Sequence, residues 1–171
     1  MTKAKPLPPL EDIEQMLDYD LDTGVFRWRI NRGRIKKGVQ AGTLLFGRNT
    51  YIHLRIGGAK YLAHRVAWLL CTKQDPLESQ IDHIDGNSCN NRITNLRIAT
   101  NTQNCYNSKR PKNNTSGYKG AYLDRRSNRW GACIRVDGQS VWLGTFDTSE
   151  LAHMAYSKAA AELHGEFART A

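Results

Sequence analysis

The 171-residue sequence lacks the features of a membrane or secreted protein. No stretch reaches the roughly eighteen consecutive apolar residues of a membrane-spanning helix. The basic N-terminus is followed by prolines and acidic residues, where a secretory signal would have an apolar core. Four cysteines are scattered without a Cys-x-x-Cys pair, which argues against a structural zinc site and a disulfide framework. We therefore expect a cytoplasmic protein with reduced cysteines.

Acidic residues are missing from the whole stretch between Asp22 and Asp75, although the chain carries a net charge of +9. A solvated face normally mixes both signs of charge, so this asymmetry favours a polyanionic partner. Nucleic acid is favoured over an anionic membrane surface because no basic amphipathic helix accompanies the charge. A plain basic loop is the alternative for residues 32–38. The cations of the stretch are Arg27, Arg29, Arg32, Arg34, Lys36, Lys37, Arg48, Arg55, Lys60, Arg65 and Lys73.

A carboxylate and an imidazole stand side by side in the stretch 81–87, with sequence IDHIDGN. Successive side chains of a strand point to opposite faces, so a twist or metal coordination must bring Asp82 and His83 to one phosphate. The segment Asp85-Gly86-Asn87 is ordinary turn chemistry, and a surface turn is the alternative interpretation. A series of amides follows over residues 90–104.

This pattern resembles the HNH endonucleases of the phage homing type and their ββα-metal core. The motifs DHIDGN, NNR and NLR carry the resemblance, with Asn95 twelve residues after His83 and Asn104 nine after Asn95. The matching motifs span roughly residues 63–107. The third position holds Asn104 instead of histidine, as in the HNN variant among phage enzymes.

The resemblance implies a one-metal phosphodiesterase. Asp82 and Asn104 would provide carboxylate and amide oxygens, a donor set that favours Mg²⁺, with Mn²⁺ as a substitute, over Zn²⁺. His83 would act as general base, and Asn95 would hold the loop and orient His83. Asp85 ranks below Asp82 as a ligand because the turn alone explains it.

Two further residues of the resemblance lie at the start of a helix expected over residues 64–70. His64 is assigned a structural role in preference to a catalytic one, and Arg65 a phosphate contact. Upstream, the pattern predicts a helix over 10–17 and a strand over 25–30 whose Phe26, Trp28 and Ile30 face a core. It also predicts a hairpin of 51–56 and 59–62, turned by a Gly-Gly pair.

The C-terminal part predicts three strands over 119–123, 129–136 and 140–146, then a helix from Glu150 to His164. Thr148 or Ser149 would cap this helix, Gly165 would close it, and its expected buried stripe is Ala152, Ala155, Tyr156, Ala159 and Leu163.

The segment from Gly117 to about Arg169 resembles the apetala-two/ethylene-response-factor DNA-binding domain, through YKGAYLDRRSNRWGACIRV and VWLGTFDTSELAHMAY. In that family the sheet enters the major groove. Tyr122 and Cys133 depart from the family pattern, so the plant target sequence does not carry over, and core and DNA contact are equally open for Trp142. The implied contacts are Lys119, Arg125, Arg129, Trp130, Arg135 and Trp142.

Together these patterns predict an α+β protein with an HNH nuclease domain over 1–108, a linker over 109–116 and a DNA-binding domain over 117–171. We expect a site-specific homing endonuclease that acts on double-stranded DNA as a monomer and nicks one strand. No obligate protein partner is evident. The alternatives are a sequence-specific DNA-binding regulator with an inactive HNH core, and a nuclease specific for RNA or DNA junctions. The cations assigned to DNA in the N-terminal part are Arg27, Arg29, Arg34, Lys36, Lys37 and Arg65.

Overall fold

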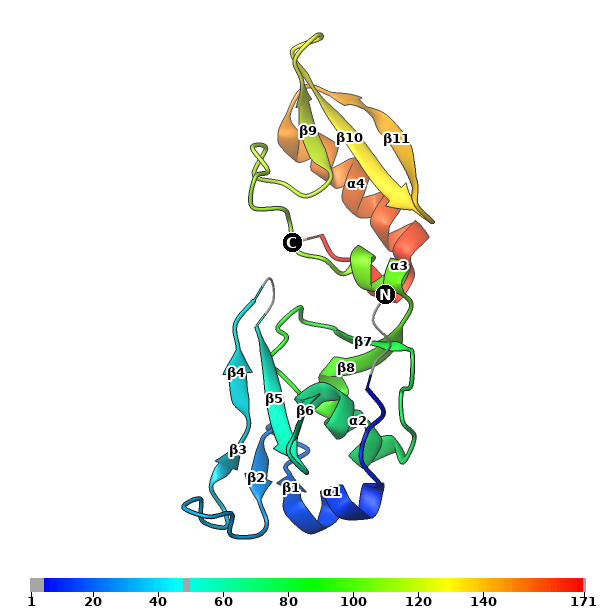
Figure 1. The fold of residues 1–171 in the computed structure, drawn as a ribbon. Helices are drawn as coiled ribbons and strands as arrows, with labels where there is room; N and C mark the ends of the chain where they lie inside the picture. The colour runs from blue at the N-terminus through cyan, green and yellow to red at the C-terminus, as the bar shows by residue number, and fades with distance from the viewer. Residues whose placement is uncertain (1–4, 48–49, 171) are drawn as a thin grey trace. The chain divides into compact units, whose positions relative to one another are not determined.

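The computed structural model describes residues 5–47 and 50–170, and the chain divides into two compact units, Met1–Ala99 and Thr100–Ala171. Arg48 and the first four residues of the N-terminal segment lie outside the described residues. Both units combine helices with small antiparallel sheets (Figure 1), so the expected α+β class is confirmed at that level. The predicted linker over 109–116 falls inside the second unit, and the domain boundaries drawn from the sequence remain a prediction.

The N-terminal unit contains three small sheets with strand orders β1-β2-β3, β4-β5-β6 and β7-β8. Its core joins the first two sheets to helix α2 through fully buried side chains such as Leu54, Val66 and Ala67. The elements are α1 (Leu10–Met16), β1 (Leu17–Tyr19), β2 (Phe26–Trp28), β3 (Gln40–Ala41), β4 (Thr43–Leu45), β5 (Tyr51–Ile56), β6 (Ala59–Leu62), α2 (Ala63–Thr72), β7 (Gln80–His83), η1 (Ile93–Asn95) and β8 (Leu96–Ala99).

Local sequence signals explain most of these elements. Strand β2 alternates as predicted, with Phe26 and Trp28 buried and Arg27 exposed. The strand ends at Trp28, however, so the expectation for Ile30 was wrong: this side chain is exposed. The hairpin β5–β6 turns at Gly57 and Gly58, both with positive φ, because a tight turn of this hand requires backbone angles that glycine adopts without strain.

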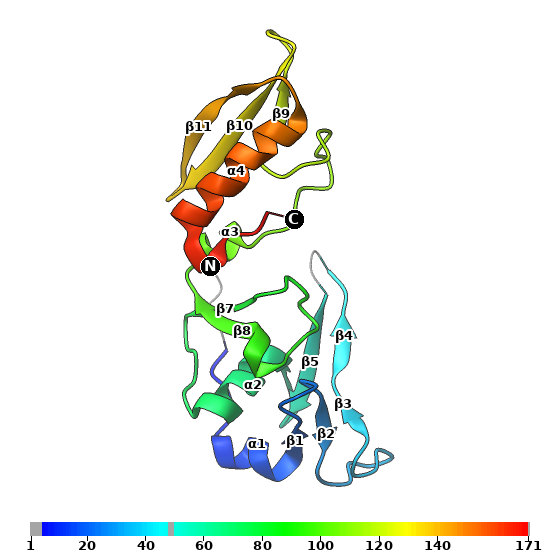
Figure 2. The same ribbon diagram turned by 180° about the vertical axis from the view of Figure 1, so that it is seen from behind.

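The C-terminal unit is a three-stranded antiparallel sheet, order β11-β10-β9, with helix α4 across one face (Figure 2). Thr148, one of the two residues expected to cap α4, is the N-cap. Leu163 is exposed, contrary to expectation, because the buried stripe of the helix continues through Ala160 to His164. The elements are α3 (Asn101–Tyr106), β9 (Ala121–Asp124), β10 (Arg129–Val136), β11 (Gln139–Phe146), α4 (Ser149–His164) and η2 (Gly165–Phe167).

Within residues 5–47 and 50–170, none of the helices combines the length and apolar character that a membrane crossing needs.

Candidate functional site

The Asp82 carboxylate lies on β7 and is paired with Arg97, its register partner on β8. Arg97 donates from Nε at 2.8 Å and from Nη2 at 2.7 Å, both to Asp82 Oδ2. The Asp82 side chain is only 4 % exposed and that of Arg97 13 %. The cation therefore compensates and orients a buried charge. Sequence reasoning missed Arg97, because its relation to Asp82 depends on the register of two strands and not on any spacing along the chain.

His83 follows on β7 and faces Asn91, whose Oδ1 lies 3.3 Å from His83 Nε2. An amide oxygen can only accept, so Nε2 carries the proton and Nδ1 is the basic nitrogen of the neutral ring. Burial lowers the pKa of His83, although Asn91 and the carboxylates of Asp85 and Asp82 act in the opposite direction. The ring is therefore held neutral, in one tautomer, at neutral pH.

Two other rings enclose His83. The His64 ring meets it edge-on at a centroid distance of 5.0 Å, and the Tyr51 ring lies 6.3 Å away. Burial, with the charges of His83, Arg65 and His53, lowers the pKa of His64 to about 3. A histidine that stays neutral over the physiological range and packs against the candidate base fits the structural role expected of it.

Asn95 closes the loop that follows β7. Its Oδ1 accepts from the Asp85 backbone N–H at 3.0 Å, while its Nδ2 donates to Asp85 Oδ1 at 3.0 Å and to the Asn90 carbonyl at 2.9 Å. The Ile84 N–H also bonds the Asn95 carbonyl. This geometry agrees with a loop-holding role for Asn95, whereas the side chain placed against the His83 Nε2 atom is Asn91.

Both carboxylate oxygens of Asp85 accept hydrogen bonds within the same loop. Oδ1 accepts from the Asn87 backbone at 2.7 Å and from Asn95, and Oδ2 accepts from Asn90 Nδ2 at 2.7 Å. Partial burial raises the pKa of Asp85, but these bonds outweigh it and the net shift is downward. The arrangement favours a turn role over metal ligation.

The hairpin formed by β1 and β2 contacts the irregular segment that carries Asn91. Tyr19 donates its hydroxyl to the Asn91 carbonyl at 2.7 Å, and burial raises the pKa of this phenol to about 12. Gly24 approaches so closely that an added Cβ would lie 2.4 Å from the Arg92 nitrogen. The N-terminal hairpin is therefore part of the support of the candidate base.

Arg65 is buried at 8 % exposure and bonded inside the protein. Its guanidinium pairs with Asp75 at 3.2 Å and donates to the carbonyls of Leu77 and Ser79. These contacts brace the segment that leads into β7. The geometry favours this internal role over the phosphate contact expected from the resemblance.

Asn104 lies on α3, which begins with a capping box of Thr100 and Gln103. This helix belongs to the second compact unit, whereas Asp82, His83 and Asn95 belong to the first. In the described part of the chain, no three His, Cys, Asp or Glu side chains gather as a metal site. A donor set of one carboxylate and one amide does not need such a cluster, and its hard oxygens suit Mg²⁺.

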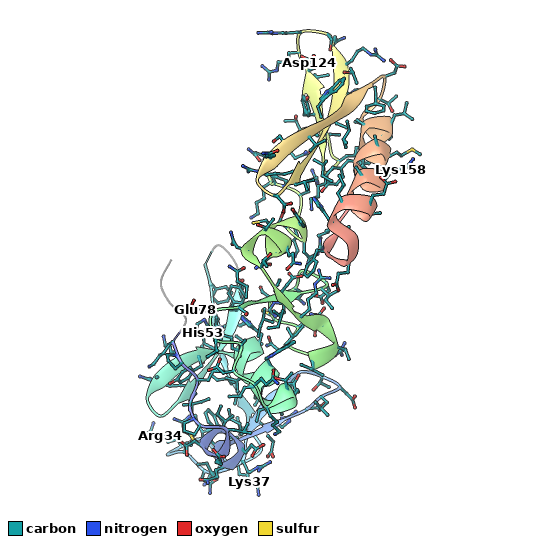
Figure 3. All side chains as sticks on the ribbon, turned by 90° about the vertical axis from the view of Figure 1, so that its right-hand side faces the viewer. Arg34, Lys37, His53, Glu78, Asp124 and Lys158 are labelled. Carbon is teal, nitrogen blue, oxygen red and sulfur yellow. The ribbon has the colours of Figure 1, made fainter. Side chains whose placement is uncertain are left out.

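The basic stretch of the N-terminal unit is exposed over residues 33–38, and Arg34 and Lys37 lie at the surface (Figure 3). Arg27 is exposed as well, with Nη1 donating to the Gly38 carbonyl at 3.2 Å. Arg29, in contrast, has a counter-charge from outside the stretch, because Asp18 Oδ1 lies 2.6 Å from its Nη2. Asp18 precedes the acid-free stretch and reaches Arg29 through the pairing of β1 with β2.

A hollow of about 630 Å³ opens beside this basic loop. Arg32 stacks over Trp28 at 4.1 Å from the ring centroid and donates to the Arg55 carbonyl. His53 lines the same hollow, and burial lowers its pKa. Cationic and aromatic side chains are thus presented together, as phosphate or base contacts require.

In the C-terminal unit, the expected DNA contacts fall into two groups. Arg125, Arg129, Arg135 and Trp142 are exposed, and Trp142, at 65 % exposure, lies opposite Cys133 on the face turned away from α4. Trp142 is therefore not part of the core. Asp124 shapes the hairpin tip beside these residues by accepting from the Arg126 backbone and from Ser127 (Figure 3).

The second group faces inward. Trp130 packs against the core on the α4 side, with Phe146 and Leu143. Lys119 donates from Nζ to the carbonyls of Tyr106 at 2.9 Å and Ser108 at 2.7 Å. Burial, assisted by Arg169, lowers the Lys119 pKa to about 8. Both residues have internal partners, which favours structural roles for them.

Comparison with known proteins gives two separate family matches. Residues 61–106 match the HNH endonuclease family, and residues 116–166 match the AP2 domain. No solved structure gives a significant match.

The relatives fall into the same two groups. "Protein 3.8" of Escherichia phage T7 is 36 % identical over 106 residues, which is 62 % of this chain and 87 % of that protein. An "uncharacterized HNH endonuclease" of Acanthamoeba polyphaga mimivirus is 34 % identical over 110 residues, 64 % of this chain and 56 % of that protein. An "AP2-like ethylene-responsive transcription factor" of Arabidopsis thaliana is 40 % identical over 55 residues, 32 % of this chain and 11 % of that protein.

Motifs, local geometry and relatives therefore lead to one assignment, and the chain belongs to the HNH endonuclease family, with an AP2 domain C-terminal to its HNH module.

Proposed function

We propose that this protein is a site-specific DNA endonuclease of the homing type, which nicks one strand with one divalent metal ion and His83 as general base. The observation that carries the proposal is the state of His83: a buried, neutral ring whose Nε2 is held by Asn91 and which stands next to Asp82. Family membership indicates nuclease activity, and the AP2 domain indicates DNA binding.

The metal would be Mg²⁺, with Mn²⁺ as a working substitute. Asp82 and Asn104 would hold it, which is the pair of ligands that the HNH resemblance implies. When bound, the cation neutralises charge on the scissile phosphate and on the departing 3′ oxygen. Two oxygen donors without imidazole or thiolate favour these hard ions over Zn²⁺.

The protein's own groups perform the remaining steps. His83 removes a proton from the attacking water through Nδ1, since Asn91 keeps the proton of the neutral ring on Nε2. Arg97 holds Asp82 in a fixed orientation, and Asn95 fixes the loop beside the base. The exposed sheet face with Arg125, Arg129, Arg135 and Trp142 binds double-stranded DNA, together with the basic loop of the N-terminal unit.

Cleavage of supercoiled plasmid DNA tests the proposal. Wild-type protein with Mg²⁺ should convert the plasmid to the nicked form, and a chelator should abolish the reaction. His83→Ala should lower the rate about 10²–10⁴-fold, the usual contribution of a positioned base, and added imidazole should restore part of it. His153→Ala is the control for loss of a histidine side chain, because His153 lies on α4 in the other compact unit.

One active site per chain predicts open circles before linear DNA. A demonstrated monomer that linearises the plasmid in one encounter would contradict the nicking mechanism. Wild-type protein that binds a selected duplex tightly yet never cleaves with Mg²⁺ or Mn²⁺ would establish the competing function, a DNA-binding regulator with an inactive HNH core. Preference for RNA or branched DNA over duplex in competition binding would contradict a major-groove reader.

A further inference from the structure

Helix α3 belongs both to the segment that matches the HNH family and to the C-terminal compact unit. The HNH match extends to residue 106 and so includes α3, whereas the compact unit that contains α3 is the one built around the AP2 domain. With only six residues, Asn101–Tyr106, such a helix is not stable by itself in water. Its position must therefore come from the groups that pack against it.

Tyr106, the last residue of α3, is held by two elements of the AP2 domain. Its ring stacks on His164 of α4 with centroids 3.6 Å apart and planes 7° from parallel. Its hydroxyl lies 3.2 Å from Asp137 Oδ1, to which it donates, and accepts from the Asp137 backbone N–H at 3.0 Å. Asp137 belongs to the turn between β10 and β11, so both the sheet and α4 contact the Tyr106 side chain.

Neighbouring contacts fix the same end of α3. His164 is buried, and its Nε2 bonds the Arg135 carbonyl of β10 at 2.8 Å, which sets the plane on which Tyr106 stacks. Lys119 reaches from the approach to β9 and bonds the carbonyls of Tyr106 and Ser108. Lys119 therefore ties the C-terminal end of α3 to the segment that leads into β9.

We infer that the AP2 domain positions Asn104 through Tyr106, so that DNA bound by the sheet determines where this HNH residue is presented. Tyr106 is a positioning residue, two places after Asn104 on the same short helix. Arg135 lies on β10, the central strand of the sheet proposed to bind DNA, and its carbonyl bonds His164, so this strand connects the proposed reading face to the support of α3. This coupling rests on the proposed function, because Asn104 matters for cleavage only if it serves the metal.

Four variants of the full chain test the inference on a duplex selected by the protein from a random pool. Tyr106→Ala should bind this duplex with unchanged Kd, lower kcat at least about tenfold and need more Mg²⁺ for half-maximal rate, since misplacement of a catalytic group costs about that much or more. Tyr106→Phe keeps the ring stack and should restore most of kcat. His164→Ala should reproduce Tyr106→Ala, with the double variant no worse than either. Tyr118→Ala is the control, because Tyr118 packs on His153 of the same helix and should leave the Mg²⁺ dependence unchanged.

Hydrogen exchange of residues 100–107 gives a readout that needs no cleavage. In wild-type protein, duplex binding should slow exchange in α3, whereas in Tyr106→Ala the duplex should bind without slowing it. If wild-type protein never cleaves, the proposed function fails while this measurement still decides the coupling. The inference would be overturned if the duplex slows α3 exchange in Tyr106→Ala as much as in wild-type protein, or if that variant keeps the wild-type kcat and Mg²⁺ dependence.

Discussion

The pair of Asp82 and Arg97 offers the sharpest test of how the candidate site is held. Arg97→Met keeps the length of the side chain and removes the two guanidinium bonds to Asp82 Oδ2, at 2.8 and 2.7 Å. Removal of one partner from a buried ion pair costs about 3–5 kcal/mol, because the remaining charge stays buried. With Arg97 at 13 % and Asp82 at 4 % exposure, we expect a loss of about 3 kcal/mol in the free energy of unfolding of the N-terminal unit.

A double-mutant cycle separates the pair from the rest of its surroundings. Asp82→Leu alone leaves a buried guanidinium, whereas Asp82→Leu with Arg97→Met replaces both charges and should recover most of the loss. The matched control is Arg29→Met, which breaks a pair of 2.6 Å whose two side chains are about half exposed. Solvent screens that pair, so its loss should cost less than about 1 kcal/mol.

Urea unfolding measures the loss in free energy of unfolding for each variant. Hydrogen exchange of residues 80–99 assigns that loss to the N-terminal unit. Mg²⁺ should stabilise Arg97→Met more than the wild type, because a cation at Asp82 replaces part of the missing charge. The reasoning is refuted if Arg97→Met costs no more than Arg29→Met, or if the losses of Arg97→Met and Asp82→Leu simply add in the double variant.

Three further perturbations address other parts of the molecule. Gly24→Ala should lower the free energy of unfolding by about 2 kcal/mol or more, since the new Cβ would lie 2.4 Å from the Arg92 backbone nitrogen. Gly33→Ala should cost only about 1 kcal/mol, because no atom lies within 4 Å of its new Cβ. Thermal unfolding measures both losses. The folded-state pKa of His64 lies near 3, below the ordinary 6.5, so the unfolded chain binds a proton first and stability is lost as pH falls from 6.5 towards 3. His64→Gln should therefore lose less free energy of unfolding between pH 7 and pH 4, and an equal loss in both proteins would contradict the assigned cause. Trp142→Ala should weaken duplex binding in a titration without lowering the melting temperature of the protein, because Trp142 is exposed. Trp130→Ala should lower the melting temperature, because Trp130 packs against the core. The opposite pair of results would contradict the roles assigned to the two tryptophans.

Local patterns in the sequence were sufficient wherever neighbours along the chain set the structure. The Gly57-Gly58 turn, the Thr148 cap and the buried Phe26 and Trp28 were predicted because turn angles, capping and strand alternation depend on a few adjacent residues. The same holds for the two family modules, whose motifs are short segments with fixed spacing.

Contacts between residues that are distant in the sequence could be found only in the tertiary structure. Arg97 meets Asp82 through strand register, Asn91 reaches His83 because the loop folds back, and His164 displaces Leu163 from the buried stripe because the last turn of α4 faces β10. Arg65 and Lys119, for which the sequence predicts DNA contacts, are bonded inside the protein to Asp75 and to the Tyr106 carbonyl. A cation has the same appearance in a sequence whether it binds phosphate or a buried carbonyl, and only packing distinguishes the two.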